Sequence, residues 1–158
     1  AGGAFVNLLL LSDSHGNTEQ LMGIKRRLKE QGKVDAILFA GDGHGDMSRL
    51  NAECDIFEVR GNCDLFSRQP DQQLITLLDT KIFLAHGHLL GVKRGLDRLA
   101  AAAREKGAKY AVYGHNHVQE INLIAGVQCI NPGALLNGEY AILNLSDGRL
   151  RFFNQATA

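Results

Sequence analysis

Apolar and polar positions in the first quarter of the chain follow two different periods. Residues 5–12 form a near-continuous aliphatic run, which is typical of a strand buried on both faces. Residues 18–31 carry apolar side chains at helical spacing, with Asn17 placed to cap the helix and Gly32 to end it. A second aliphatic run at 36–40 completes a strand, helix, strand unit, which predicts a right-handed crossover between parallel strands.

The rest of the chain predicts one more long helix, at 95–106, and many short strands. The expected strands are 56–60, 73–78, 81–85, 110–113, 119–124, 127–130, 140–145 and 149–153. The first hairpin is expected to turn at Asp79-Thr80, and the alternating segments after residue 113 predict a run of antiparallel strands. We therefore expect an α/β fold, a four-layer α/β/β/α sandwich of two mixed sheets flanked by helices.

No repeat, low-complexity tract or linker divides the sequence. One domain over residues 1–158 is therefore expected. The opening stretch 1–4 lacks an initiator methionine and is interpreted as an added remnant outside the fold.

Composition narrows the function classes. The 158 residues are 45% hydrophobic, and 17 basic residues balance 17 acidic ones, so no overall positive field exists to hold nucleic acid or an anionic membrane. Three cysteines without C-x-x-C spacing indicate neither a disulfide framework nor a zinc knuckle. No apolar run approaches the about 20 residues of a membrane span. We expect a cytoplasmic protein without membrane contact or strong nucleic-acid binding.

Polar blocks stand directly after the predicted buried strands. They are Asp13-Ser14-His15, Gly41-Asp42, Gly61-Asn62-Cys63-Asp64, His86-Gly87-His88 and Gly114-His115-Asn116-His117. Because the ligand crevice of an open α/β sheet lies outside the carboxyl ends of its strands, these blocks are expected to meet. All six histidines of the chain lie in or beside them, whereas histidines used only at the solvated surface would be scattered.

The side chains in these blocks suit a transition-metal site. Carboxylates, an amide and imidazoles favour Mn²⁺, Fe, Zn²⁺ or Ni²⁺ over Ca²⁺. One four-coordinate zinc ion would use only half of them, whereas two ions about 3.5 to 4 Å apart that share a carboxylate would use them all. Two divalent ions against Asp13 and Asp42 leave a formal positive excess, which attracts phosphate.

The ordered blocks D-x-H, G-D, G-N-x-D, H-G-H and G-H-x-H resemble those of the calcineurin-like metallophosphoesterase superfamily over nearly the whole chain. With the stretch 86–95, which contains Gly-Val-Lys-Arg-Gly, and with Asn131-Pro132-Gly133, they resemble its small YfcE-like phosphodiesterase branch. The resemblance implies that one metal is held by Asp13, His15, Asp42 and His117, and the other by Asp42, Asn62, His86 and His115. It also implies that a metal-bridging hydroxide attacks phosphorus. The expected cofactors are two divalent ions, Mn²⁺ first, with Ni²⁺, Zn²⁺, Fe²⁺ or Mg²⁺ as alternatives.

Cys63 departs from the wider superfamily, in which protein phosphatases place a histidine that serves as the candidate general acid. A thiol is a poor proton source for a leaving alkoxide, so we expect a small phosphodiester substrate, or an activated ester, rather than a monoester with a high-pKa leaving group. The preferred interpretation of Cys63 itself is a small buried side chain. Three alternatives stay open: a phosphomonoesterase, a metallonuclease, and a scaffold like the retromer subunit of the same fold, in which the histidine set is incomplete.

Four residues are expected to act in catalysis: Asp42, Asn62, His88 and Asp64. His88 is interpreted as contacting phosphate or supporting the ligands, and Asp64 as either an orienting carboxylate or a turn residue. His44 could reach the substrate phosphate or protonate the leaving group, although a turn or surface role is the simpler interpretation. Homo-oligomerisation is left open.

Overall fold

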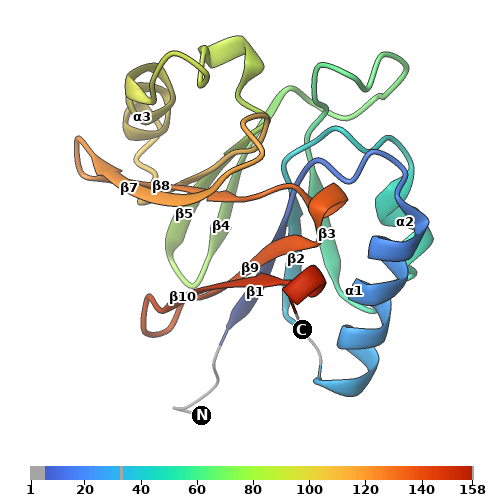
Figure 1. Ribbon diagram of the computed structural model, residues 1–158. Helices are drawn as coiled ribbons and strands as arrows, with labels where there is room; N and C mark the ends of the chain where they lie inside the picture. The colour runs from blue at the N-terminus through green and yellow to red at the C-terminus, as the bar shows by residue number, and fades with distance from the viewer. Residues whose placement is uncertain (1–5, 33, 158) are drawn as a thin grey trace.

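Two five-stranded sheets lie face to face at the centre of the molecule, with helices on both outer faces (Figure 1). The computed structural model describes residues 6–32 and 34–157. The expected remnant at 1–4 lies outside these residues. The prediction of an α/β sandwich of two mixed sheets is confirmed.

The first sheet carries three parallel strands that end at one edge. Its strands, in spatial order, are β10 (Leu150–Asn154), β9 (Glu139–Asn144), β1 (Asn7–Leu11), β2 (Ala36–Phe39) and β3 (Asp55–Glu58). The pairs β1–β2 and β2–β3 are parallel, whereas β9 lies antiparallel to both β1 and β10. The loops that follow β1, β2 and β3 therefore leave the sheet on the same side.

The second sheet has a parallel centre and antiparallel edges. Its strands, in spatial order, are β4 (Gln72–Leu77), β5 (Thr80–Ala85), β6 (Tyr110–Val112), β8 (Val127–Pro132) and β7 (Gln119–Ile124). The pairs β5–β6 and β6–β8 are parallel, and the outer pairs are hairpins. The antiparallel pairing predicted after residue 113 is confirmed for β7–β8 and β9–β10, but β8 also pairs in parallel with β6. The alternating pattern of apolar and polar residues predicts hairpins between strands that are neighbours in sequence. It does not predict pairing between strands that are further apart in sequence, such as β8 with β6.

The first hairpin also turns one residue earlier than expected. Leu77 pairs with Thr80, so the turn consists of Leu78 and Asp79. Both have positive φ, 48° and 58°, as the tight two-residue turns of twisted hairpins require. Leucine rarely adopts that conformation, so the residue types in the sequence did not indicate that the turn lies at Leu78 and Asp79.

Alternate side chains of each central strand serve different layers. Leu8 and Leu10 of β1 join the core between the two sheets, while Leu9 and Leu11 face the helices α1 and α2. All four are fully buried, which explains why the run is aliphatic throughout. A third cluster lies between the second sheet and α3.

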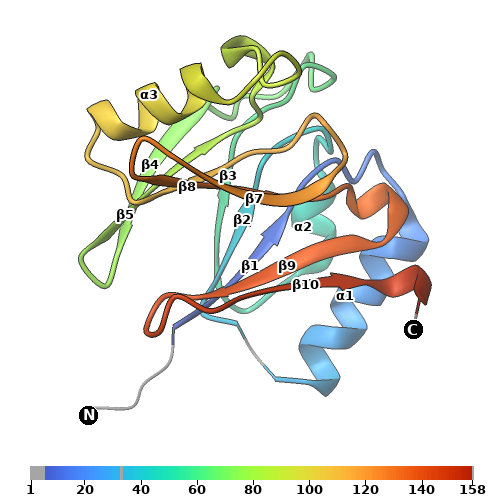
Figure 2. The same ribbon diagram turned by 60° about the vertical axis from the view of Figure 1, so that its left-hand side comes forward.

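Three helices cover the outer faces (Figure 2). They are α1 (Thr18–Glu30), α2 (Asp46–Leu50) and α3 (Asp97–Glu105), with short 3₁₀ turns at His88–Leu90, Leu135–Asn137 and Gln155–Thr157. Asn17 caps α1 as predicted, because its Oδ1 accepts a hydrogen bond from the backbone N–H of Gln20 at 3.1 Å. The sequence did not predict α2, whose five residues are too few to show a helical period. No helix among the described residues has the length and apolar character that a bilayer crossing requires.

Candidate functional site

Loops from both sheets bring the predicted polar blocks together. His86, which follows β5, has its Nε2 atom 2.9 Å from Asn62 Oδ1, 3.2 Å from His115 Nδ1 and 3.3 Å from Asp42 Oδ2. His86 follows β5, Asn62 follows β3, His115 follows β6 and Asp42 follows β2. The expectation that sequence-distant strand ends meet at one place is confirmed.

A second group lies beside the first and centres on Asp13. His117 Nε2 is 3.3 Å from Asp13 Oδ1, and His15 Nε2 is 3.9 Å from that oxygen. Asp13 Oδ2 accepts hydrogen bonds from the Ser12 hydroxyl at 2.6 Å and from the backbone N–H of His115 at 3.0 Å. Asp13 Oδ1, in contrast, is buried without a hydrogen-bond partner. A buried carboxylate oxygen without a partner is costly, and a bound cation would satisfy it.

Asp42 lies between the two groups. Its Oδ1 accepts a hydrogen bond from the backbone N–H of Cys63 at 2.8 Å, and its Oδ2 faces both His86 and His15, the latter at 3.9 Å. Burial alone would raise the pKa of Asp42, but these hydrogen bonds and the nearby imidazoles outweigh burial and lower the pKa to about 2. The carboxylate therefore stays ionised and can face a cation on either side.

His86 shows why the cluster needs positive charge. Its Nδ1 donates a hydrogen bond to the backbone carbonyl of Ala40 at 2.7 Å, so Nδ1 carries a proton. Its Nε2 then faces the oxygens of Asn62 and Asp42, which can only accept. Burial opposes protonation, but Asp42 and Asp13 prevail and raise the pKa of His86. These acceptor atoms need a positively charged partner between them, which a proton or a metal ion at Nε2 would provide. The residues present therefore fit a divalent cation.

The backbone is strained at five of the seven candidate ligand positions. Asp13, His15, Asp42, His115 and His117 have φ values of 54°, 47°, 65°, 72° and 57°, in the left-handed region. Each such residue costs about 1 kcal/mol or more, and such costs concentrate at functional sites. This strain is a second sign, independent of the side chains, that the cluster is a site.

Two glycines of the sequence blocks allow close approach to the carboxylates. A Cβ atom on Gly61 would lie 2.1 Å from Asp42 Oδ1, and one on Gly114 would lie 1.8 Å from the Ser12 hydroxyl oxygen. Any side chain there would displace a group that holds a candidate ligand. The G-N-x-D and G-H-x-H patterns therefore have a packing reason for their glycines.

Asp64 lies behind the ligands and ties two loops together. Its Oδ2 accepts from the backbone N–H groups of Asp42 and Gly61, both at 2.8 Å, and its Oδ1 from those of Gly43 and His44 at 3.0 and 2.9 Å. It is 6% exposed and has no place in the ligand groups found among the described residues. The geometry is that of a positioning residue.

Asp46 is also a positioning residue, a role that the sequence did not indicate. Its Oδ2 accepts from the Ser14 hydroxyl at 2.6 Å and from the Gly16 N–H at 2.7 Å, which holds the loop that carries His15. Its only sequence signal was its place in the Gly-His-Gly-Asp stretch after Asp42.

Cys63, His88 and His44 occupy different places around the cluster. The interpretation of Cys63 as a buried side chain is wrong: it is exposed, and its Sγ lies within 4.8 Å of ligand atoms of His15 and Asp42. The G-N-x-D turn presents it outward instead of packing it. His88 lies beside the cluster, its ring centroid 5.4 Å from that of His86, and its Nδ1 is buried without a partner. His44 is exposed and lines a neighbouring cavity, outside the ligand groups found among the described residues.

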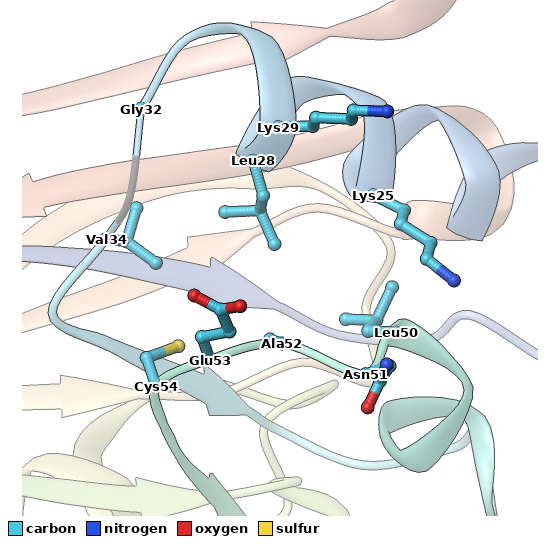
Figure 3. Close-up of a pocket in the computed structure, with 10 residues that line it drawn as sticks. All are labelled: Lys25, Leu28, Lys29, Gly32, Val34, Leu50, Asn51, Ala52, Glu53 and Cys54. Carbon is cyan, nitrogen blue, oxygen red and sulfur yellow. The ribbon is translucent and has the colours of Figure 1, made fainter.

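A cavity of about 450 Å³ lies elsewhere, between α1 and the segment before β3 (Figure 3). Leu28 from the helix and Glu53 from that segment point toward one another across it. Its lining contains no histidine and none of the candidate ligands. The histidine cluster, not this cavity, is therefore the candidate active site.

Three known proteins are similar to this chain in sequence or in fold. The chain is 35% identical over 159 residues to the probable metallophosphoesterase YsnB of Bacillus subtilis, a match that covers 96% of this chain and 92% of that protein. A predicted phosphoesterase of Streptococcus pneumoniae has a similar structure, with a TM-score of 0.80, 27% identity, and coverage of 97% of this chain and 91% of that one. Vps29 of Entamoeba histolytica in complex with Zn²⁺ shares the fold, with a TM-score of 0.71, 21% identity, and coverage of 94% and 97%.

The sequence pattern of the calcineurin-like phosphoesterase superfamily domain matches residues 6–148, which include every candidate ligand. The Asp, Asn and His side chains that converge at the strand ends therefore all lie within the matched region. The chain belongs to the calcineurin-like phosphoesterase superfamily.

Proposed function

We propose that this protein hydrolyses phosphodiesters with two divalent cations, Mn²⁺ first among the candidates. One ion would be held by Asp13, His15, Asp42 and His117, and the other by Asp42, Asn62, His86 and His115. The observation that carries the proposal is the convergence of acceptor atoms around Asp42, together with the unpartnered Oδ1 of Asp13. When bound, the cations supply Lewis acidity toward phosphate and a nucleophile at neutral pH.

The side chains of the cluster would have different roles in holding the cations and orienting the substrate. Asp42 faces both ligand groups, and Asn62 offers a neutral oxygen that leaves positive charge available for an anionic substrate. His86 is fixed by its hydrogen bond to Ala40, so its Nε2 always faces the cluster. His88 lies beside the ligands and would present its imidazole to the phosphate.

The proposed preference for diesters rests on the residue at position 63, beside the cluster. At the position where a histidine would serve as an acid, this chain has the exposed thiol of Cys63, and a thiol is a weak hydrogen-bond donor and a poor proton source for a leaving alkoxide. An alkoxide leaving group of a monoester would therefore lack an effective acid.

The test is hydrolysis of bis-p-nitrophenyl phosphate by protein purified without chelator, before and after Mn²⁺ is added, paired with elemental analysis. We expect metal-dependent turnover that falls at least about 100-fold in Asp42→Asn. An alkyl phosphomonoester should be turned over far more slowly than the diester. Equal rates on both would refute the diester preference, and no hydrolysis with any metal would favour the scaffold role.

His44 is a separate hypothesis under this proposal. Its side chain lines a cavity with Glu58 and Phe66, so an acid role would require substrate to extend there. If His44 protonates the leaving group, His44→Ala lowers turnover and changes the pH profile. An unchanged profile leaves His44 as a surface residue.

A further inference from the structure

We propose that a cleft beside Asn62 receives a neutral, aromatic group of the phosphodiester, and that Leu65 and Leu89 set this preference. The inference rests on the proposed function and names the substrate class. The cleft has a volume of about 310 Å³, and its lining includes Arg60, Asn62, Leu65, Asp71, His88 and Leu89.

The cleft lies beside the candidate metal centre. Asn62 lines it and also places its Oδ1 2.9 Å from His86 Nε2. A phosphate bound at the ligand cluster would therefore direct one of its two organic groups toward the cleft. That group, unlike the phosphate, meets no metal ligand other than Asn62 there.

Two exposed leucines line this cleft. Leu65 is 78% exposed and comes from the loop after β3, and Leu89 is 59% exposed and comes from the 3₁₀ turn after β5. Apolar side chains from two separate loops that meet beside a polar site indicate a surface that a ligand covers. Each would lose water-exposed area when an apolar group enters.

The charges of the cleft disfavour an anionic group. Arg60 Nε is 2.8 Å from Asp71 Oδ1, so the guanidinium and the carboxylate neutralise one another. The carboxylate of Asp64 is already used by four backbone N–H groups. A second phosphate or a carboxylate would find no unpaired cation among the lining side chains.

The remaining polar groups suit a flat ring. The planar guanidinium of Arg60 can stack on an aromatic face, and His88 lines the same cleft. An aryl group or a nucleobase offers both a face and an apolar edge for the leucines. The same features give a methyl group little to contact.

The test compares p-nitrophenyl phenyl phosphate with p-nitrophenyl methyl phosphate, which share a leaving group and differ only in the second substituent. Wild-type protein should prefer the phenyl ester in kcat/KM. The phenyl-to-methyl ratio should fall about tenfold in the double variant Leu65→Ala/Leu89→Ala. Leu123→Ala is the matched control, because Leu123 is 71% exposed on β7 and does not line the cleft.

A ratio that survives in the double variant overturns the inference while leaving the proposed function intact. If wild-type protein hydrolyses neither ester with any metal, the proposed function fails instead. A binding readout supports the distinction: in Mg²⁺-loaded protein, the leucine methyl NMR signals missing from the Leu65→Ala and Leu89→Ala spectra should shift when the phenyl ester is added. Shifts confined to other leucines would contradict the assignment.

Discussion

At the residue scale, the two oxygens of Asp13 have different environments. Oδ2 accepts hydrogen bonds from the Ser12 hydroxyl and a backbone N–H, whereas Oδ1 is buried without a hydrogen-bond partner. The block that contains Asp13 and the histidines around it could be predicted from the sequence, because metal-ligating side chains recur at strand ends. The outward position of Cys63 and the role of Asp46 could not, since both depend on contacts between loops.

Replacing Asp13 with asparagine should separate its two functions. The amide oxygen can keep the hydrogen bonds that Oδ2 accepts, while the NH₂ group replaces the free oxygen with a donor. We expect diesterase activity to fall more than about 100-fold. Circular dichroism should show an unchanged fold, and activity within about threefold of wild type would contradict the ligand role.

Cys63→His should restore an acid near the cluster. The Sγ atom lies within 4.8 Å of ligand atoms of His15 and Asp42, so an imidazole at this position can approach the leaving group. We expect turnover of an alkyl phosphomonoester to rise about tenfold or more. Cys54→His, at a half-buried position outside the ligand groups of the described residues, is the control. A rise in both variants, or in neither, would count against the explanation of diester preference.

At the element scale, buried carboxylates fix the loops that the strands deliver. The long strands and helices were predictable because their periods are set by burial on one or two faces, as in β1 and α1. Short elements such as α2, and the partner of β8, were not, because tertiary contacts decide them. The loop after β2 depends on Asp64 in the loop after β3, which no local pattern specifies.

Asp64→Asn should loosen these two loops. An asparagine can place only one oxygen where Asp64 accepts four backbone N–H groups, so two donors would face an NH₂ group. We expect the free energy of unfolding to fall by about 2 to 3 kcal/mol in urea denaturation. Asp71→Asn, which breaks an exposed ion pair, should cost less than about 1 kcal/mol. Equal effects of the two substitutions would show that Asp64 is not a positioning residue.

At the scale of the whole molecule, two sheets that share a core present their loops at one edge (Figure 1). Asp13 and Asp42 from the first sheet meet His86 and His115 from the second. The site therefore exists only while the sheets stay packed together. Cation binding should stabilise the fold as a whole, since its ligands span both halves.

Mn²⁺ should accordingly raise the melting temperature of chelator-treated protein. A concentration about 100 times the dissociation constant adds about 2.7 kcal/mol, or about 5 to 10 °C for a chain of this size. Differential scanning calorimetry measures the shift, with Mg²⁺ and Ca²⁺ as comparison ions. The double variant Asp13→Asn/Asp42→Asn should lose the shift. A shift of the same size in that variant would place the binding elsewhere.

The sharing of Asp42 between two cations is tested most directly by anomalous diffraction from crystals grown with Mn²⁺. We expect two anomalous peaks about 3.5 to 4 Å apart on either side of the Asp42 carboxylate, one beside Asp13 and His117 and the other beside Asn62 and His86. No peak at the cluster, or peaks away from Asp42, would contradict this account.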